Sequence, residues 1–75
     1  MKFKFSVALR NALLKRGMTN VRLAQIMGVY PQQIVRWKSS DDAKISLAAR
    51  ICDALEIDII DFIEMGKVQD DRPEL

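Results

Sequence analysis

The chain has 75 residues, 49% of them hydrophobic, and a formal net charge of +2. This length leaves room for one small domain, and the apolar fraction is too high for a disordered chain. No stretch approaches the ~20 apolar residues of a membrane span. A single cysteine and no histidine exclude an intrachain disulfide and a zinc site, so we expect no metal, no cofactor and a reducing, intracellular setting.

The charges are divided unevenly along the chain. Residues 1–40 contain eight basic residues and no acidic residue, whereas residues 41–75 contain four basic and ten acidic residues. A purely cationic first half indicates a surface that binds a polyanion. The alternative is that so small a protein is uneven in charge by chance.

Capping signals divide residues 6–65 into five short helices, which predicts an all-α fold. The expected helices are one capped by Ser6 and running to Arg16, one capped by Thr19 and running to Met27, one from Pro31 to about Lys38, one capped by Ser46 and running to Leu55, and one capped by Asp58 and running to about Met65. Gly17 and Gly28 end the first two helices.

The remaining residues lie outside this helical unit. Residues 1–5 are expected to be an N-terminal extension, residues 6–65 the domain, and residues 66–75 a loose polar C-terminal tail. The alternating sequence MKFKF at the start suits a short strand, which would offer a possible interface with another chain.

The third expected helix has two chemically different sides. A helix turns by 100° per residue, so a side that buries Ile34 and Trp37 leaves Gln32, Val35 and Arg36 facing outward together. Arginine can bind guanine, glutamine can bind adenine, and valine can pack on a thymine methyl group. The alternative is the ordinary polar side of an amphipathic helix.

The second expected helix has a small residue where a neighbour must come close. Leu23, Ala24, Ile26 and Met27 are expected to face inward. Only three or four residues separate this helix from the third, so a small side chain such as Ala24 lets the two helices cross. Gly28 supplies a left-handed stop between them.

One motif in this region resembles the helix-turn-helix of the Cro/CI-type (lambda-repressor-like, XRE) DNA-binding family: Asn20-x-x-Leu23-Ala24-x-x-x-Gly28-Val29-x-x-x-x-Ile34-x-x-Trp37. The similarity extends over about residues 6–65. It implies a compact five-helix domain, with the helix-turn-helix at helices 2 and 3, that binds double-stranded DNA.

The resemblance also implies site residues. The positions that face bases in the family are occupied by Gln32, Val35 and Arg36, with Gln33 on the flank. The positions that meet the DNA backbone are occupied by Asn20, Tyr30, Lys38, Ser39, Ser40 and Lys44. For Asn20, the alternative is a simple helix cap.

Four features depart from the family pattern. Pro31 replaces a residue that often reads a base, and Ser39–Ser40 replaces the usual Asn-Gly pair. Asp41–Asp42 brings negative charge close to the DNA edge, which should lower affinity unless the loop turns these residues outward. Glu56 replaces the glycine that normally ends the fourth helix, and it must accept strain or a different turn.

The fifth expected helix carries more apolar residues than one small core needs. We expect Ile60 in particular to join a two-fold homodimer, and the alternative is that it fills the core.

The resemblance and the cationic first half together lead to the hypothesis of a Cro-like repressor of a phage, prophage or mobile element, acting in the bacterial cytoplasm at the nucleoid. The alternative function is an antitoxin whose acidic half binds a protein partner. No cluster of nucleophile and base is present, so we expect no enzyme activity.

Overall fold

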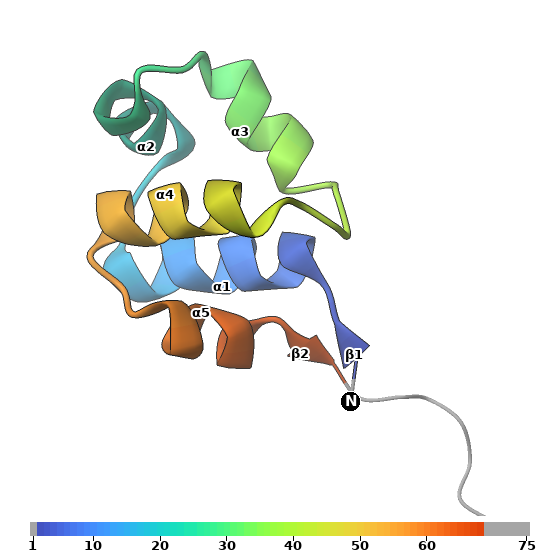
Figure 1. Ribbon diagram of the computed structural model, residues 1–75. Helices are drawn as coiled ribbons and strands as arrows, with labels where there is room; N and C mark the ends of the chain where they lie inside the picture. Colours follow the sequence, from blue (N-terminus) through green and yellow to red (C-terminus); the bar gives the residue numbers. More distant parts are fainter. Residues whose placement is uncertain (1, 69–75) are drawn as a thin grey trace, which may run out of the picture.

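The computed structural model describes residues 2–68, which form five helices with a two-residue strand at each end. The elements are β1 (Lys2–Phe3), α1 (Phe5–Arg16), α2 (Asn20–Met27), α3 (Pro31–Trp37), α4 (Ile45–Leu55), α5 (Ile59–Met65) and β2 (Lys67–Val68). In Figure 1, α1 and α4 lie side by side, with α5 below them and α2 and α3 above. The five-helix fold with its helix-turn-helix at α2 and α3 is confirmed.

Three of the predicted helix starts are confirmed. The Thr19 hydroxyl accepts a hydrogen bond from the Arg22 backbone N–H at 3.1 Å, which caps α2. The Asp58 carboxylate accepts one from the Ile60 backbone N–H at 2.9 Å, which caps α5. Pro31 is the first residue of α3, where its missing N–H is not needed.

Three helices end in the left-handed conformation. Gly17 ends α1 with φ 61°, and Gly28 ends α2 with φ 71°, as predicted. Glu56 ends α4 with φ 55° and is the one non-glycine residue among residues 2–68 with positive φ. Of the two alternatives stated for Glu56, the chain adopts the strained one, at a cost of about 1 kcal/mol.

Two of the predicted helix starts are wrong. Helix α1 begins at Phe5, and Ser6 lies inside it, where its hydroxyl donates to the Asp41 carboxylate at 2.9 Å. The Phe5 backbone N–H donates to the Asp41 carbonyl at 3.0 Å. Helix α4 begins at Ile45, one residue before Ser46, and has no side-chain cap. The start of α1 is therefore satisfied by a loop 35 residues away, a partner that local sequence cannot indicate.

The core is organised around α1. This helix buries six residues, more than any other helix of the described chain. At one end of the core, the rings of Phe5 and Phe62 lie 6.0 Å apart at 57°, which joins α1 to α5. The buried apolar residues are Phe5, Ala8, Leu9, Ala12, Leu13, Leu23, Ala24, Ile34, Ala48, Ile51, Cys52, Leu55 and Phe62.

One predicted core residue of α2 is not buried. Leu23 and Ala24 are buried and Met27 is half-buried, but Ile26 is 44% exposed. The first three fall within an arc of roughly 100° on the helix, and Ile26 lies outside that arc. The prediction that Ile26 faces inward is therefore wrong.

The two ends of the described chain pair with each other. Strand β1 lies antiparallel to β2, with Lys2 opposite Val68 and Phe3 opposite Lys67. Lys2 and Phe3 of the expected N-terminal extension thus pair with Lys67 and Val68 of the expected loose tail in one small ribbon, and the strand suggested by MKFKF has a partner within its own chain. Phe5, also assigned to the extension, is the first residue of α1. The part of the expected tail at residues 69–75 lies outside the described residues.

The ribbon packs closely on Gly66. The Lys4 backbone N–H donates to the Gly66 carbonyl at 2.9 Å. A Cβ atom at Gly66 would lie 2.8 Å from the Cβ of buried Ala8 and would collide with the Phe3 ring. A side chain at this position would therefore displace the ribbon from α1.

The lone cysteine is a packing residue. Cys52 is buried in α4. Burial, followed by the negative charges of Asp53 and Asp58, raises the pKa of the Cys52 thiol to about 11. The thiol is therefore protonated at neutral pH and lacks the thiolate that redox chemistry requires.

Candidate nucleic-acid interface

Helix α3 turns one side to the core and the other to solvent. Ile34 is fully buried, and Trp37 is half-buried against the core. On the opposite side Gln32 and Arg36 are exposed, and Val35 is 54% exposed. The structure thus brings the three residues with the expected base-reading chemistry to one outward face.

The angle of α3 is fixed by its close crossing with α2. Ala24 is almost fully buried on α2, which packs against both α3 and α4. Gly28 reverses the chain in its left-handed conformation, and the Val29 backbone N–H then donates to the Ala24 carbonyl at 3.0 Å. Val29 itself packs against the core. The small side chain of Ala24 and the positive φ of Gly28 therefore determine how α3 projects from the domain.

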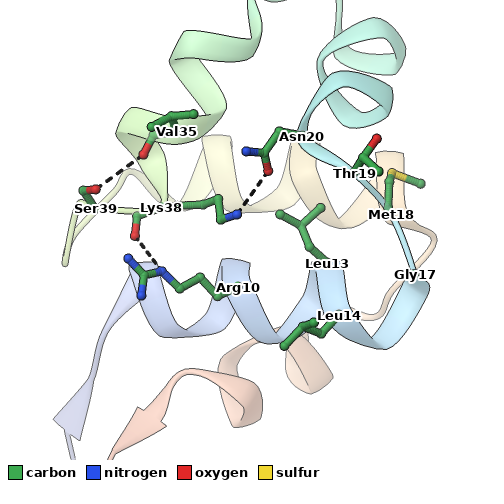
Figure 2. A pocket seen from close by; sticks show the side chains of 10 residues that line it. All are labelled: Arg10, Leu13, Leu14, Gly17, Met18, Thr19, Asn20, Val35, Lys38 and Ser39. Atoms are coloured by element: carbon green, nitrogen blue, oxygen red, sulfur yellow. Dashed lines mark hydrogen bonds between the residues drawn. The ribbon is translucent and has the colours of Figure 1, made fainter.

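An open groove of about 770 Å³ lies between α1 and the helix-turn-helix (Figure 2). It is lined by Arg10, Leu13, Leu14, Gly17, Met18, Thr19, Asn20, Val35, Lys38 and Ser39. Two of these residues are cations and none is acidic. Val35 belongs both to the groove and to the outward face of α3, so the groove opens beside that face.

Hydrogen bonds in the groove join three elements (Figure 2). The Lys38 ammonium, at the end of α3, donates to the Asn20 side-chain oxygen at the start of α2, with 3.2 Å between Nζ and Oδ1. The Arg10 side chain of α1 donates through Nε to the Lys38 carbonyl at 3.1 Å. Asn20 and Lys38, both expected to contact the DNA backbone, are therefore brought together by the fold.

The sequence indicates no specific role for Arg10. It lies on α1, outside the helix-turn-helix motif, and its place beside Lys38 depends on how α1 packs against α3. The only signal in the sequence was its membership of the cationic first half.

The two serines after α3 already use their hydroxyl protons. The Ser40 hydroxyl donates to the Asp42 carbonyl at 2.7 Å, and the Ser39 hydroxyl donates to the Val35 carbonyl at a long 3.5 Å. A hydroxyl has one proton to donate. Ser39 can exchange its weak bond for a phosphate more readily than Ser40 can, so Ser39 is the better candidate of the two.

The adjacent acidic pair is bound to the protein's own groups. The Asp41 carboxylate accepts from Ser6 on α1, and the Asp42 carboxylate accepts from the Ala43 backbone N–H at 2.9 Å. The Asp41 side chain is therefore turned toward α1. These bonds hold the two carboxylates in place, and both residues remain exposed.

Tyr30 and Lys44 are both exposed at the N-cap position of a helix. Tyr30 occupies the position just before α3 and is 77% exposed. Lys44 occupies the corresponding position before α4 and is also exposed. Neither side chain caps the helix that follows it, so both are available to a ligand.

Within the described residues, the cations of the first half form no salt bridge with a carboxylate. Across residues 2–68 the one ion pair joins Lys67 to Glu64 at 2.9 Å. No basic residue of the helix-turn-helix or of α1 is in a salt bridge within that range. An unpaired cation can bind a phosphate without first losing an internal partner.

Residues 2–68 contain neither a membrane span nor a cluster of metal ligands. No helix between residues 2 and 68 is long and apolar enough to cross a membrane. No group of three or more His, Cys, Asp or Glu residues in that range could hold a metal ion.

Comparison with known proteins gave one match. A family model described as a Cro/C1-type HTH DNA-binding domain matches residues 8–67, more than half of the chain. The matched range runs from α1 into β2 and includes every residue that lines the groove. No curated protein and no solved structure matches the chain.

Proposed function

Since the chain belongs to the Cro/C1-type helix-turn-helix DNA-binding family, and is thus a DNA-binding transcription regulator, we propose that it is a Cro-like repressor of a phage, prophage or mobile element. In this proposal α3 enters the major groove of an operator that overlaps a promoter, and the bound protein excludes RNA polymerase. It acts in the bacterial cytoplasm, at the nucleoid. The observation that carries the proposal is the outward face formed by Gln32, Val35 and Arg36 opposite buried Ile34.

The three residues on this face suit different base edges. The Arg36 guanidinium can donate two hydrogen bonds to guanine, and the Gln32 amide can bind adenine through one donor and one acceptor. Val35 offers an apolar surface to a thymine methyl group. Gln33 is exposed on the flank and reaches a neighbouring base or a phosphate. Asn20, Tyr30, Lys38, Ser39, Ser40 and Lys44 contact the DNA backbone and set the orientation of the domain.

Selection of bound sequences from a random duplex pool tests this proposal. A two-fold dimer should enrich an inverted repeat whose half-site centres lie about one helical turn, ~34 Å, apart. Binding that enriches no sequence would contradict specific recognition. A promoter fused to the selected site, with and without the protein, then measures whether transcription falls.

We also propose that the regulator is a homodimer joined through α5. Ile60 is 66% exposed on this helix, and Ile59 and Ile63 beside it are only half-buried. Burying such side chains between two copies removes apolar area from water. A domain of this size gains stability from association, because its own core supplies only a few kcal/mol.

Replacing Ile60 with aspartate is expected to convert the dimer to a monomer, because it places a charge in the proposed contact. Ile45→Asp is a matched control, since Ile45 is 68% exposed on another helix. Sedimentation of the three proteins should give a dimer for the wild type and for Ile45→Asp and a monomer for Ile60→Asp. A wild-type protein that stays monomeric well above micromolar concentration would refute the dimer.

An antitoxin is the second candidate function. Acidic residues are exposed around the turn from α4 to α5, at Asp53, Glu56, Asp58 and Asp61. This surface suits a basic protein partner while the cationic groove binds DNA. A toxin-like reading frame beside the gene would favour this function, and co-purification of its product with the chain would establish the pair.

A further inference from the structure

We propose that Arg10 of α1 contacts the DNA backbone beside the Lys38–Asn20 pair, which extends the interface beyond the helix-turn-helix. This inference rests on the proposed function, because it assumes that α3 occupies the major groove. The residue lies outside the motif and was not among the site residues expected from the sequence.

A single hydrogen bond holds the Arg10 side chain at the end of α3. Its Nε donates to the carbonyl of Lys38, the residue that follows α3. A guanidinium has five N–H donors, so the remaining four stay available for a planar, bidentate contact with an oxyanion. Arg10 is exposed and is not paired with any carboxylate within residues 2–68.

The groups around Arg10 are also hydrogen-bond donors. The Lys38 ammonium can only donate, so the atom of Asn20 that it meets must be the side-chain oxygen. This bond leaves the Asn20 side-chain NH₂ group free to donate. Arg10, Lys38 and Asn20 therefore present donors from three elements, and none of the acidic residues between positions 2 and 68 lines the groove. Such a set matches the acceptor-only oxygens of a phosphodiester.

The position of the groove identifies the anion as the DNA strand. Val35, a proposed base-reading residue, lines the same groove as Arg10 and Lys38 (Figure 2). A backbone that passes beside the outward face of α3 must therefore run next to these cations. The apolar floor formed by Leu13, Leu14 and Met18 offers a surface for the deoxyribose rings between phosphates.

The test compares Arg10→Gln with Lys15→Gln in the full chain. Lys15 is also an exposed cation of α1 but does not line the groove, so it controls for net charge. Arg10→Gln should weaken binding to the selected operator roughly tenfold. It should also make the plot of the logarithm of the association constant against the logarithm of the salt concentration less steep, by about 0.9. The selected sequence should stay the same. Lys15→Gln should change both quantities much less.

A further variant distinguishes two roles of Arg10, contact with the DNA backbone and support of α3. Arg10→Lys keeps the charge but loses the Nε–H group that donates to the Lys38 carbonyl, so it should retain most of the wild-type salt slope. Equal effects of Arg10→Gln and Lys15→Gln would overturn the inference. A changed base preference with an unchanged salt slope would also overturn it, since Arg10 would then only position α3. Failure of the wild type to select any sequence would instead refute the proposed function.

Discussion

Replacing Ile34 with alanine is expected to lower the free energy of unfolding by about 2–5 kcal/mol. Ile34 is the only fully buried residue of α3, which has seven residues and is too short to be helical by itself. The lost side chain leaves a cavity where α3 meets the core. A domain of this size has a net stability of only a few kcal/mol, so the variant should be largely unfolded or should lose α3 from the fold.

Val35→Ala is the matched control for this change. The residue is next in the same helix and is half exposed, so its truncation should alter stability by no more than about 0.5 kcal/mol. Urea denaturation followed by circular dichroism measures both variants. Equal stability of Ile34→Ala and Val35→Ala would mean that α3 is not held by its buried side. Binding of Val35→Ala to the selected operator should change mainly at one base pair.

Replacing Arg36 with alanine is expected to weaken operator binding by roughly 1–3 kcal/mol and to relax the preference at one base pair of each half-site. The reason is the loss of a bidentate contact to guanine, which distinguishes one base pair from the other three. The side chain is exposed, so the unfolding midpoint should not change. Binding to the selected operator and to every single-base variant of it measures both effects.

Arg50→Ala controls for the loss of a positive charge. Arg50 is exposed on α4 and does not line the groove. Its removal should reduce affinity slightly for all sequences and leave the base preference unchanged. If Arg36→Ala keeps both the affinity and the base preference of the wild type, the groove-facing side of α3 has been assigned wrongly.

Much of the helical frame was predictable from the sequence because its determinants are local. Thr19 and Asp58 cap the helices that follow them, and Gly17 and Gly28 end α1 and α2 in the left-handed conformation. Each of these interactions spans only a few residues. Helical periodicity likewise fixed the outward position of Arg36 once Ile34 was assigned to the core.

Three expectations drawn from local patterns are wrong, at Ser6, Ser46 and Ile26. Ser6 looked like a cap, but the loop at Asp41 satisfies the start of α1. Ile26 has the apolar side chain of a core residue, but the helices packed on α2 leave it 44% exposed. A local pattern gives the orientation of a side chain on its own helix, and it does not indicate whether another element lies there.

The sequence by itself determined the five helices, the turn between α2 and α3 and the outward face of α3, since capping, glycine conformation and helical repeat act within a few residues. Tertiary packing alone decided that β1 pairs with β2 and that Arg10 meets Lys38, whose partner in turn is Asn20. Each of these contacts joins residues 18 to 66 positions apart, so it exists only after the helices have packed around the core.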